Sequence, residues 1–174
     1  RFLPRKRKWI LIFEELVATF LLAFDRAAYT YRGDVSGYAY VMVRLSNFMV
    51  FFLTSAIVFG FNLYLTNLLL TDGKMEKIPK RLMVAQFGSV TGMLLAVVSH
   101  FTGLYYYFDG QNVYHRGEGF LIAYLIPVII PILQYTVIRQ YKKYFSRFIY
   151  ISLVLYIFVP IIVGIVQIFT DRKS

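Results

Sequence analysis

The stretch YAYVMVRLSNFMVFFLTSAIVFGFNLYLTNLLL, residues 38–70, carries one charged side chain, Arg44, in 33 residues. A hydrophobic stretch of this length with so little charge is typical of a membrane-spanning helix. At a rise of about 1.5 Å per residue it would be about 50 Å long, whereas the hydrocarbon core of a bilayer is about 30 Å thick. The sequence therefore predicts a transmembrane helix that tilts, breaks or projects past the membrane.

The rest of the chain has the same apolar character. Of the 174 residues, 59% are hydrophobic and only 16% are charged, whereas soluble domains are about 45–50% apolar and about 25% charged. We predict one transmembrane domain over residues 1–174, an all-α integral membrane bundle of about five helices. With a cytoplasmic N-terminus, which the charge pattern described below predicts, five spans would leave the end of the last helix outside the cytoplasm. We therefore expect this chain to be a piece of a longer protein. The predicted spans are residues 9–31, 38–70, 82–104, 120–138 and 148–169.

The net charge of +10 is distributed in clusters between the apolar runs. Residues 1–8 hold five Lys and Arg, and residues 71–81 and 139–147 hold four each, whereas the two alternate linkers hold only Arg32 and Arg116. Because basic residues stay on the cytoplasmic side, this alternation predicts a cytoplasmic N-terminus. The clustering is explained by topology, and no nucleic-acid recognition motif is present, so nucleic acid is not an expected partner.

Catalytic and metal-binding motifs are absent from the sequence. The chain has two histidines and no cysteine, and it contains no HExxH, GxSxG or P-loop pattern. We therefore predict no enzyme activity, no metal site and no cofactor within these residues.

Small residues recur at spacings of three and four along the third predicted helix. Such a face lets helix backbones approach closely inside a membrane. It predicts packing within the bundle, and the alternative is a homodimer through the same face. The predicted packing residues are Gly88, Gly92, Ala96, Ser99 and Gly103.

Charged and amide side chains inside the spans are the next candidates for function, because they are costly in a membrane. Asp25 and Arg44 fall at similar depths near the outer ends of neighbouring helices, which predicts an ion pair. That pair either fixes helix register or lines a pocket that opens outward. Glu14 lies beside the N-terminal basic cluster and predicts an interfacial salt bridge, with a proton relay as the alternative. Gln134 predicts a hydrogen bond between helices.

Residues 105–119, YYYFDGQNVYHRGEG, form the longest non-helical stretch. An Asp-Gly pair between aromatic and apolar residues favours a two-residue β-hairpin turn. We predict strands over residues 105–108 and 112–115, forming a small extracytoplasmic hairpin between the third and fourth helices. Its aromatic and charged side chains either hold a small ligand or form a structural cap on the helix ends.

Three stretches resemble a known kind of membrane domain: VRLSNF at residues 43–48, FTGLYYYFD at 101–109 leading into NVYHRG at 112–117, and LIP at 125–127. Together they resemble the multi-helix membrane input region of bacterial GGDEF-type diguanylate cyclases and some sensor histidine kinases. The resemblance implies location in the inner membrane of a bacterium, a sensory role in signal transduction and a cytoplasmic output domain as partner. Any cyclase or kinase chemistry would lie outside these residues.

The residues that carry this likeness are the candidates for a ligand-binding site on the outer face. They are Arg44, Asn47, Tyr105, Tyr106, Asp109, Tyr114, His115 and Arg116. Two other functions stay open on the sequence alone: a transporter or channel component with a pathway near Asp25 and Arg44, and an accessory structural subunit.

Overall fold

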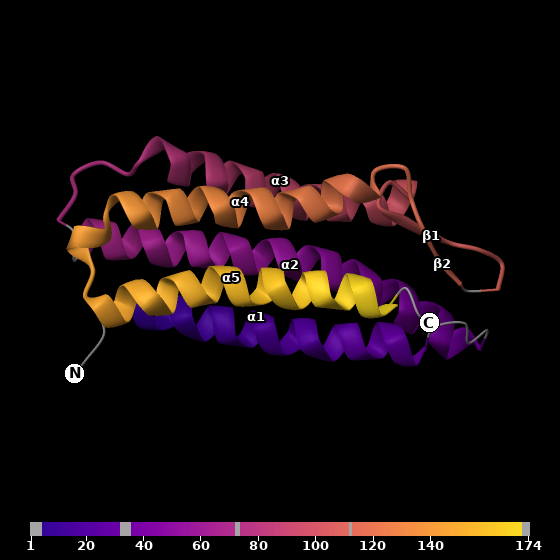
Figure 1. Cartoon of the computed structure of the whole chain (residues 1–174). Helices are drawn as coiled ribbons and strands as arrows, with labels where there is room; N and C mark the ends of the chain where they lie inside the picture. The colour runs from indigo at the N-terminus through magenta and orange to yellow at the C-terminus, as the bar shows by residue number, and fades with distance from the viewer. Residues whose placement is uncertain (1–4, 32–35, 72–73, 112, 172–174) are drawn as a thin grey trace.

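The computed structural model describes residues 5–31, 36–71, 74–111 and 113–171. Within these ranges five α-helices lie side by side along one bundle axis, and a small hairpin projects at one end (Figure 1). The helices are α1 (Arg5–Thr30), α2 (Gly37–Thr71), α3 (Lys80–Thr102), α4 (Phe120–Gln140) and α5 (Arg147–Asp171). The hairpin strands are β1 (Tyr106–Phe108) and β2 (Tyr114–Arg116), and a 3-10 turn, η1 (Lys142–Tyr144), precedes α5.

The prediction of a helical bundle with one small hairpin is confirmed. Each predicted helix overlaps an observed one, and the ends agree within four residues. By length and composition, α2, α3 and α4 are able to cross a membrane. The described part of α5 adds a shorter apolar stretch, Arg147–Ile162, and the spanning of the bilayer by α1 and α5 stays a prediction.

Helix α2 is the centre of the bundle. It continues unbroken over 35 residues, so of the three predicted alternatives the break does not occur. It packs against α1, α3 and α4, and its C-terminal half contributes four of the nine buried residues of the main apolar core. That core consists of Phe61, Leu65, Leu68, Leu69, Leu82, Val137, Ile138, Leu153 and Ile157.

The outward faces of the helices are strongly apolar. Phe87, Phe101, Leu121 and Phe148 are each more than 70% exposed. A soluble monomer rarely exposes so many large apolar side chains. The surface is therefore compatible with a multi-pass membrane protein.

The small-residue face of α3 packs inside this chain. A Cβ atom at Gly92 would overlap Ser55 of α2, and one at Gly88 would overlap Ile130 of α4. Gly103 has another role: its φ of 72° is left-handed, and its N–H donates to the Ser99 carbonyl at 2.9 Å, which ends α3. A dimer through the same face would have to displace α2 or α4.

The hairpin differs from the prediction in its strand boundaries and turn. Tyr106 pairs with Arg116 and Phe108 with Tyr114, so the loop is longer than the two residues expected. The Asp109 side chain accepts hydrogen bonds from the Gln111 and Val113 amides and so widens the turn. Asn112, predicted in the second strand, lies outside the described residues.

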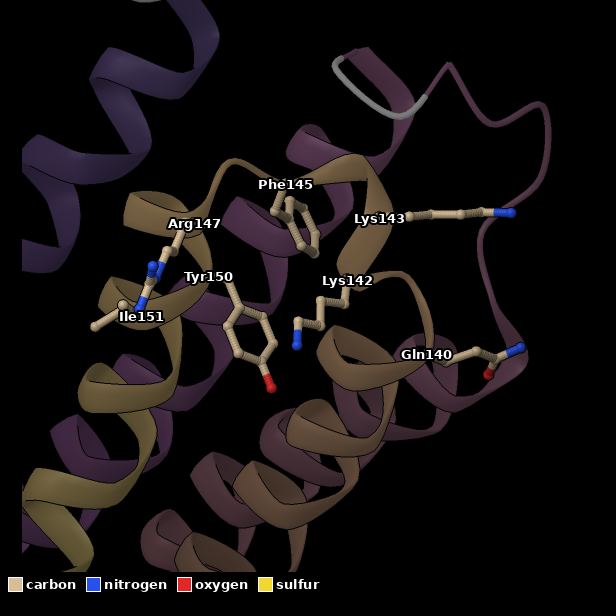
Figure 2. Close-up of a pocket in the computed structure, with 7 residues that line it drawn as sticks. All are labelled: Gln140, Lys142, Lys143, Phe145, Arg147, Tyr150 and Ile151. Atoms are coloured by element: carbon tan, nitrogen blue, oxygen red, sulfur yellow. The ribbon is translucent and has the colours of Figure 1, made fainter.

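The turn from α4 to α5 is tight and basic. The Ile149 amide donates to Ser146 Oγ at 3.2 Å, which caps the start of α5. Figure 2 shows the open pocket, about 920 Å³ in volume, that this turn forms with the ends of both helices.

Candidate functional site

The hairpin packs against the N-terminal half of α2 through stacked aromatic rings. The Phe51 ring lies 5.2 Å from the Tyr106 ring, in a stacked arrangement, and 5.6 Å from the Tyr105 ring. Tyr106 stacks in turn on Tyr114 of β2 at 5.9 Å. Tyr105 and Tyr106 are only 2% and 3% exposed, so these two candidate site residues fill the space beneath the hairpin.

The hydroxyl groups of these two tyrosines are buried without a hydrogen-bond partner among the described residues. Burial raises the pKa of both hydroxyls, because the phenolate would be poorly solvated. A buried hydroxyl with no partner costs about 1–3 kcal/mol. Such a group calls for a water molecule or a ligand atom to bond with it.

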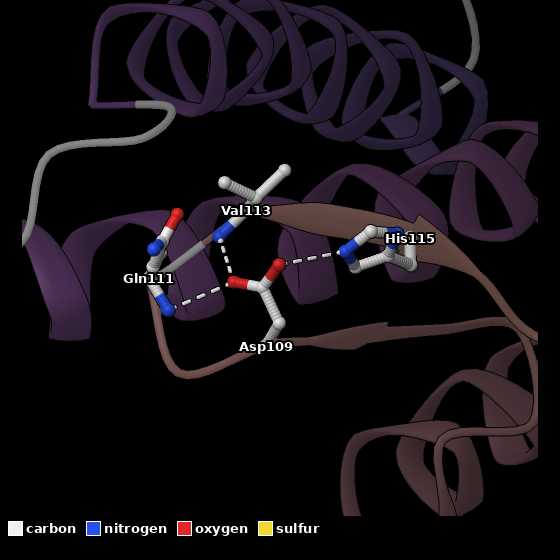
Figure 3. Close-up of polar contacts among 4 residues, drawn as sticks. All are labelled: Asp109, Gln111, Val113 and His115. Carbon is white, nitrogen blue, oxygen red and sulfur yellow. Dashed lines mark hydrogen bonds and ion pairs between the residues drawn. The ribbon is translucent and has the colours of Figure 1, made fainter.

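The tip of the hairpin is organised by Asp109 (Figure 3). Its Oδ2 lies 2.8 Å from Nε2 of His115, and its Oδ1 accepts hydrogen bonds from the amides of Gln111 at 2.8 Å and Val113 at 3.0 Å. The His115 contact, followed by the Val113 amide, holds the pKa of the Asp109 carboxyl below its ordinary value. Tyr107 stacks on the His115 ring at 5.2 Å. The structure therefore brings the candidate residues Asp109 and His115 into contact, as a common ligand site would need. The same carboxylate also stabilises the hairpin turn.

Two arginines of the candidate site contact aromatic rings. The Arg44 guanidinium lies 3.4 Å from the Tyr40 ring centroid and 4.7 Å from that of Phe108, so it joins α2 to β1. Arg116 lies 4.6 Å from the ring centroid of Phe120, at the start of α4.

The remaining candidates are less clearly part of one site. The Asn47 amide donates to the Val43 carbonyl of its own helix at 2.8 Å, which makes it a helix-internal group in this state. The ion pair between Asp25 and Arg44 stays a prediction.

A second polar region, in the opposite half of the bundle, joins three helices. Gln134 of α4 donates to Asn62 Oδ1 at 3.2 Å and to the Val58 carbonyl at 3.3 Å. Asn62 of α2 donates in turn to the Leu82 carbonyl of α3 at 2.9 Å. The predicted hydrogen bond of Gln134 to another helix is therefore confirmed.

Glu14 is the residue whose environment the sequence interpretation missed. It is only 6% exposed, where α1 meets α2 and α5, and it makes no ion pair with the described basic residues. Tyr156 donates a hydrogen bond to Oε2, whereas Oε1 has no partner and faces Gly60. Arg7 instead donates to Asn67 at 3.1 Å. The predicted interfacial salt bridge of Glu14 is therefore wrong.

A sequence signal for this burial existed. Ile10, Glu14 and Val17 follow the three- and four-residue spacing of one helix face, and all three are buried. Gly60 has no side chain, which leaves room for the carboxyl group on α2; a Cβ there would overlap Glu14 Oε1.

The polar groups of the described residues include no cluster of three or more His, Cys, Asp or Glu side chains suited to a metal ion. The two regions thus offer hydrogen bonds, aromatic faces and single charges.

No family model, no curated protein and no solved structure matches this chain.

Proposed function

We propose that this chain is the membrane-embedded input domain of a bacterial signalling protein. In this proposal five helices cross the inner membrane with the N-terminus in the cytoplasm, and the hairpin lies on the outer face. A small polar or aromatic ligand binds at the hairpin and regulates a cytoplasmic output domain of the cyclase or kinase type. The likeness of residues 43–48, 101–117 and 125–127 to such input regions supports this role.

The observation that carries the proposal is the attachment of the hairpin to α2. Phe51 and Arg44 hold the hairpin to the N-terminal half of this helix. Asn62, farther along the same helix, belongs to the second polar region, where it bonds to Gln134. A change in hairpin packing therefore acts on an element that reaches the other end of the bundle. A ligand shifts the packing only if it binds two arrangements with different affinity.

The buried tyrosine hydroxyls suggest where such a difference arises. Tyr105 Oη and Tyr106 Oη have no hydrogen-bond partner within the described structure. A ligand with a hydrogen-bond acceptor, inserted beneath the hairpin, would satisfy them. An arrangement in which a ligand accepts hydrogen bonds from these hydroxyls would then be favoured over one in which they have no partner.

The test uses one hairpin variant and one matched control in lipid nanodiscs. A Cβ at Gly117 would overlap the carbonyl oxygens of Gly103 and Leu104, whereas one at Gly110 has open space around it. Gly117→Ala should therefore loosen the hairpin, and Gly110→Ala should not. Because the chain has no cysteine, spin labels at Leu16→Cys and Leu155→Cys report the separation of α1 and α5.

We expect Gly117→Ala to shift the distance distribution between the two labels, and Gly110→Ala to leave it as in the parent. Circular dichroism should show equal helix content in both. If the Gly117→Ala distribution equals that of the parent while its hairpin amides lose protection, the hairpin does not communicate with the helices, and the signalling proposal fails.

A transport function is the second candidate, and the buried carboxyl group of Glu14 favours it. Buried carboxyl groups inside a membrane often carry protons in transport. Proton uptake into vesicles, followed with an entrapped pH dye, should then be lost in Glu14→Gln and retained in Glu15→Gln, since Glu15 is exposed. Equal uptake in both variants would remove this candidate.

A further inference from the structure

We propose that the turn between α4 and α5 binds the phosphate headgroup of an anionic phospholipid. Lys142, Lys143 and Arg147 lie around the pocket in this turn, together with Tyr150 and Ile151, and Figure 2 shows the Lys143 side chain extending away from the other two cations. In the figure Lys142 extends into the space between the end of α4 and the start of α5, toward Tyr150, and Arg147 lies on the other side of that tyrosine.

In the part of the chain that the structure describes, no Asp or Glu forms a salt bridge with Lys142, Lys143 or Arg147. The sequence places no acidic residue between Glu118 and Asp171, although Glu76 lies in the α2–α3 linker at the same end of the bundle. Among the described residues, the contacts of the two lysines are with aromatic rings: Lys142 Nζ lies 5.0 Å from the Tyr150 ring centroid, and Lys143 Nζ lies 5.2 Å from that of Tyr144. An anion from outside the chain is the partner that this arrangement lacks.

The start of α5 adds to the preference for an anion. Arg147 is the first residue of this 25-residue helix, and because Ser146 caps the Ile149 amide, the first-turn amides left for an anion are those of Arg147 and Phe148. Helix N-terminal amides and the helix dipole favour negative charge. A phosphate group accepts hydrogen bonds from ammonium, guanidinium, phenol and amide groups together, and Arg is especially suited to it.

The surroundings favour a lipid over free phosphate. Phe148, Ile151 and Leu155 are 80%, 46% and 54% exposed and follow one face of α5 away from the pocket. This apolar face is suited to acyl chains attached to a headgroup held by the cations. The lipid assignment rests on the proposed orientation, in which this end of the bundle meets the anionic cytoplasmic leaflet.

The test measures lipid retention by native mass spectrometry of the whole chain in detergent. Phosphatidylglycerol and phosphatidylcholine are added in turn to the parent, to Lys142→Gln/Arg147→Gln and to Lys77→Gln/Lys80→Gln. The second pair removes the same charge from the same end of the bundle, but outside the pocket. The conservative pair Lys142→Arg/Arg147→Lys retains the charge and reports whether the pocket tolerates substitution.

We expect the parent, the linker pair and the conservative pair to retain phosphatidylglycerol in preference to phosphatidylcholine. The pocket pair should bind phosphatidylglycerol at least about tenfold more weakly, which corresponds to about 1.4 kcal/mol. An excess of inorganic phosphate should not displace the lipid, because it makes no contact with the apolar face.

Three results would overturn the proposal. Equal losses in the pocket and linker pairs would mean diffuse attraction to surface charge, and equal retention of the two lipids would mean no headgroup preference. Full displacement by inorganic phosphate would identify a site for free anions. Because the measurement is made in detergent, it does not depend on topology, and the proposed orientation is tested separately by thiol labelling.

Discussion

Asp109 illustrates how one carboxylate organises the hairpin, and it makes the tip sensitive to acid. It contacts His115 and accepts hydrogen bonds from two amides, and these contacts lower its pKa from an ordinary value of 3.8. A group with a lowered pKa stabilises the folded state above its ordinary pKa, and this contribution is lost as the pH falls through the folded-state value. We predict that the hairpin is ordered from neutral pH down to about pH 4 and loosens below it.

The measurement is amide protection at Val113, corrected for the intrinsic dependence of exchange on pH. Asp109→Asn removes the titrating group, so protection should be lower at neutral pH and show no acid transition of its own. An acid transition in Asp109→Asn that matches the parent would assign the effect to another residue. Loss of protection in the parent well above pH 4 would also contradict the prediction.

The burial of Glu14 is a feature that was not predicted from the sequence. The charge on Glu14 and its neighbouring basic cluster indicated an interfacial ion pair, but burial depends on which face of α1 meets α2. Gly60, which is 46 residues away in sequence, leaves room for the carboxyl group because it has no side chain. The three- and four-residue spacing with Ile10 and Val17 favours burial, but the prediction for Glu14 rested on the nearby charge alone.

At the scale of elements, Gln134 tests how helices are held together. It is almost fully buried and bonds to Asn62 Oδ1 and the Val58 carbonyl. Gln134→Leu keeps similar volume but leaves the Asn62 oxygen without this donor. Interhelical hydrogen bonds in membranes contribute about 0.6 kcal/mol on average, up to about 1.7, so we predict a loss of about 1–2 kcal/mol in the free energy of unfolding.

The measurement is unfolding of the chain in bicelles, with Gln86→Leu as the matched control because Gln86 is exposed on α3. The control should lie within about 0.5 kcal/mol of the parent. If both variants change stability equally, the buried bonds of Gln134 do not hold α4 to α2.

The positions of the helices were predicted well because they depend on the length of the apolar runs. The register of the hairpin was predicted less well because it depends on side-chain hydrogen bonds. The long apolar runs placed all five helices. The hairpin was expected from its Asp-Gly pair, but its register was not, because the Asp109 side chain bonds to two backbone amides and lengthens the loop. The candidate ligand residues are partly brought together, since Asn47 bonds within its own helix.

At the scale of the whole molecule, the sequence pattern of charge becomes a pattern in space. The start of α1, the linker between α2 and α3, and the turn between α4 and α5 lie at one end of the bundle, and the hairpin lies at the other (Figure 1). The basic clusters are therefore gathered at one end, as an alternating topology requires. What sequence could not show is that one cluster forms a pocket, because this depends on how α4 and α5 approach each other.

This gathering of charge predicts the orientation of the molecule. Moving the clustered end across the membrane would translocate three basic segments, which the positive-inside rule opposes. Single cysteines replacing Gly110 at the hairpin and Lys77 in the α2–α3 linker have no background, because the chain has no cysteine. In intact bacterial spheroplasts an impermeant thiol reagent should label Gly110→Cys only, and Lys77→Cys should react only after permeabilisation. The opposite pattern would reverse the topology and place the hairpin in the cytoplasm. Labelling of both in intact spheroplasts would mean that α3 does not cross the bilayer, which would remove the basis for an outer ligand site.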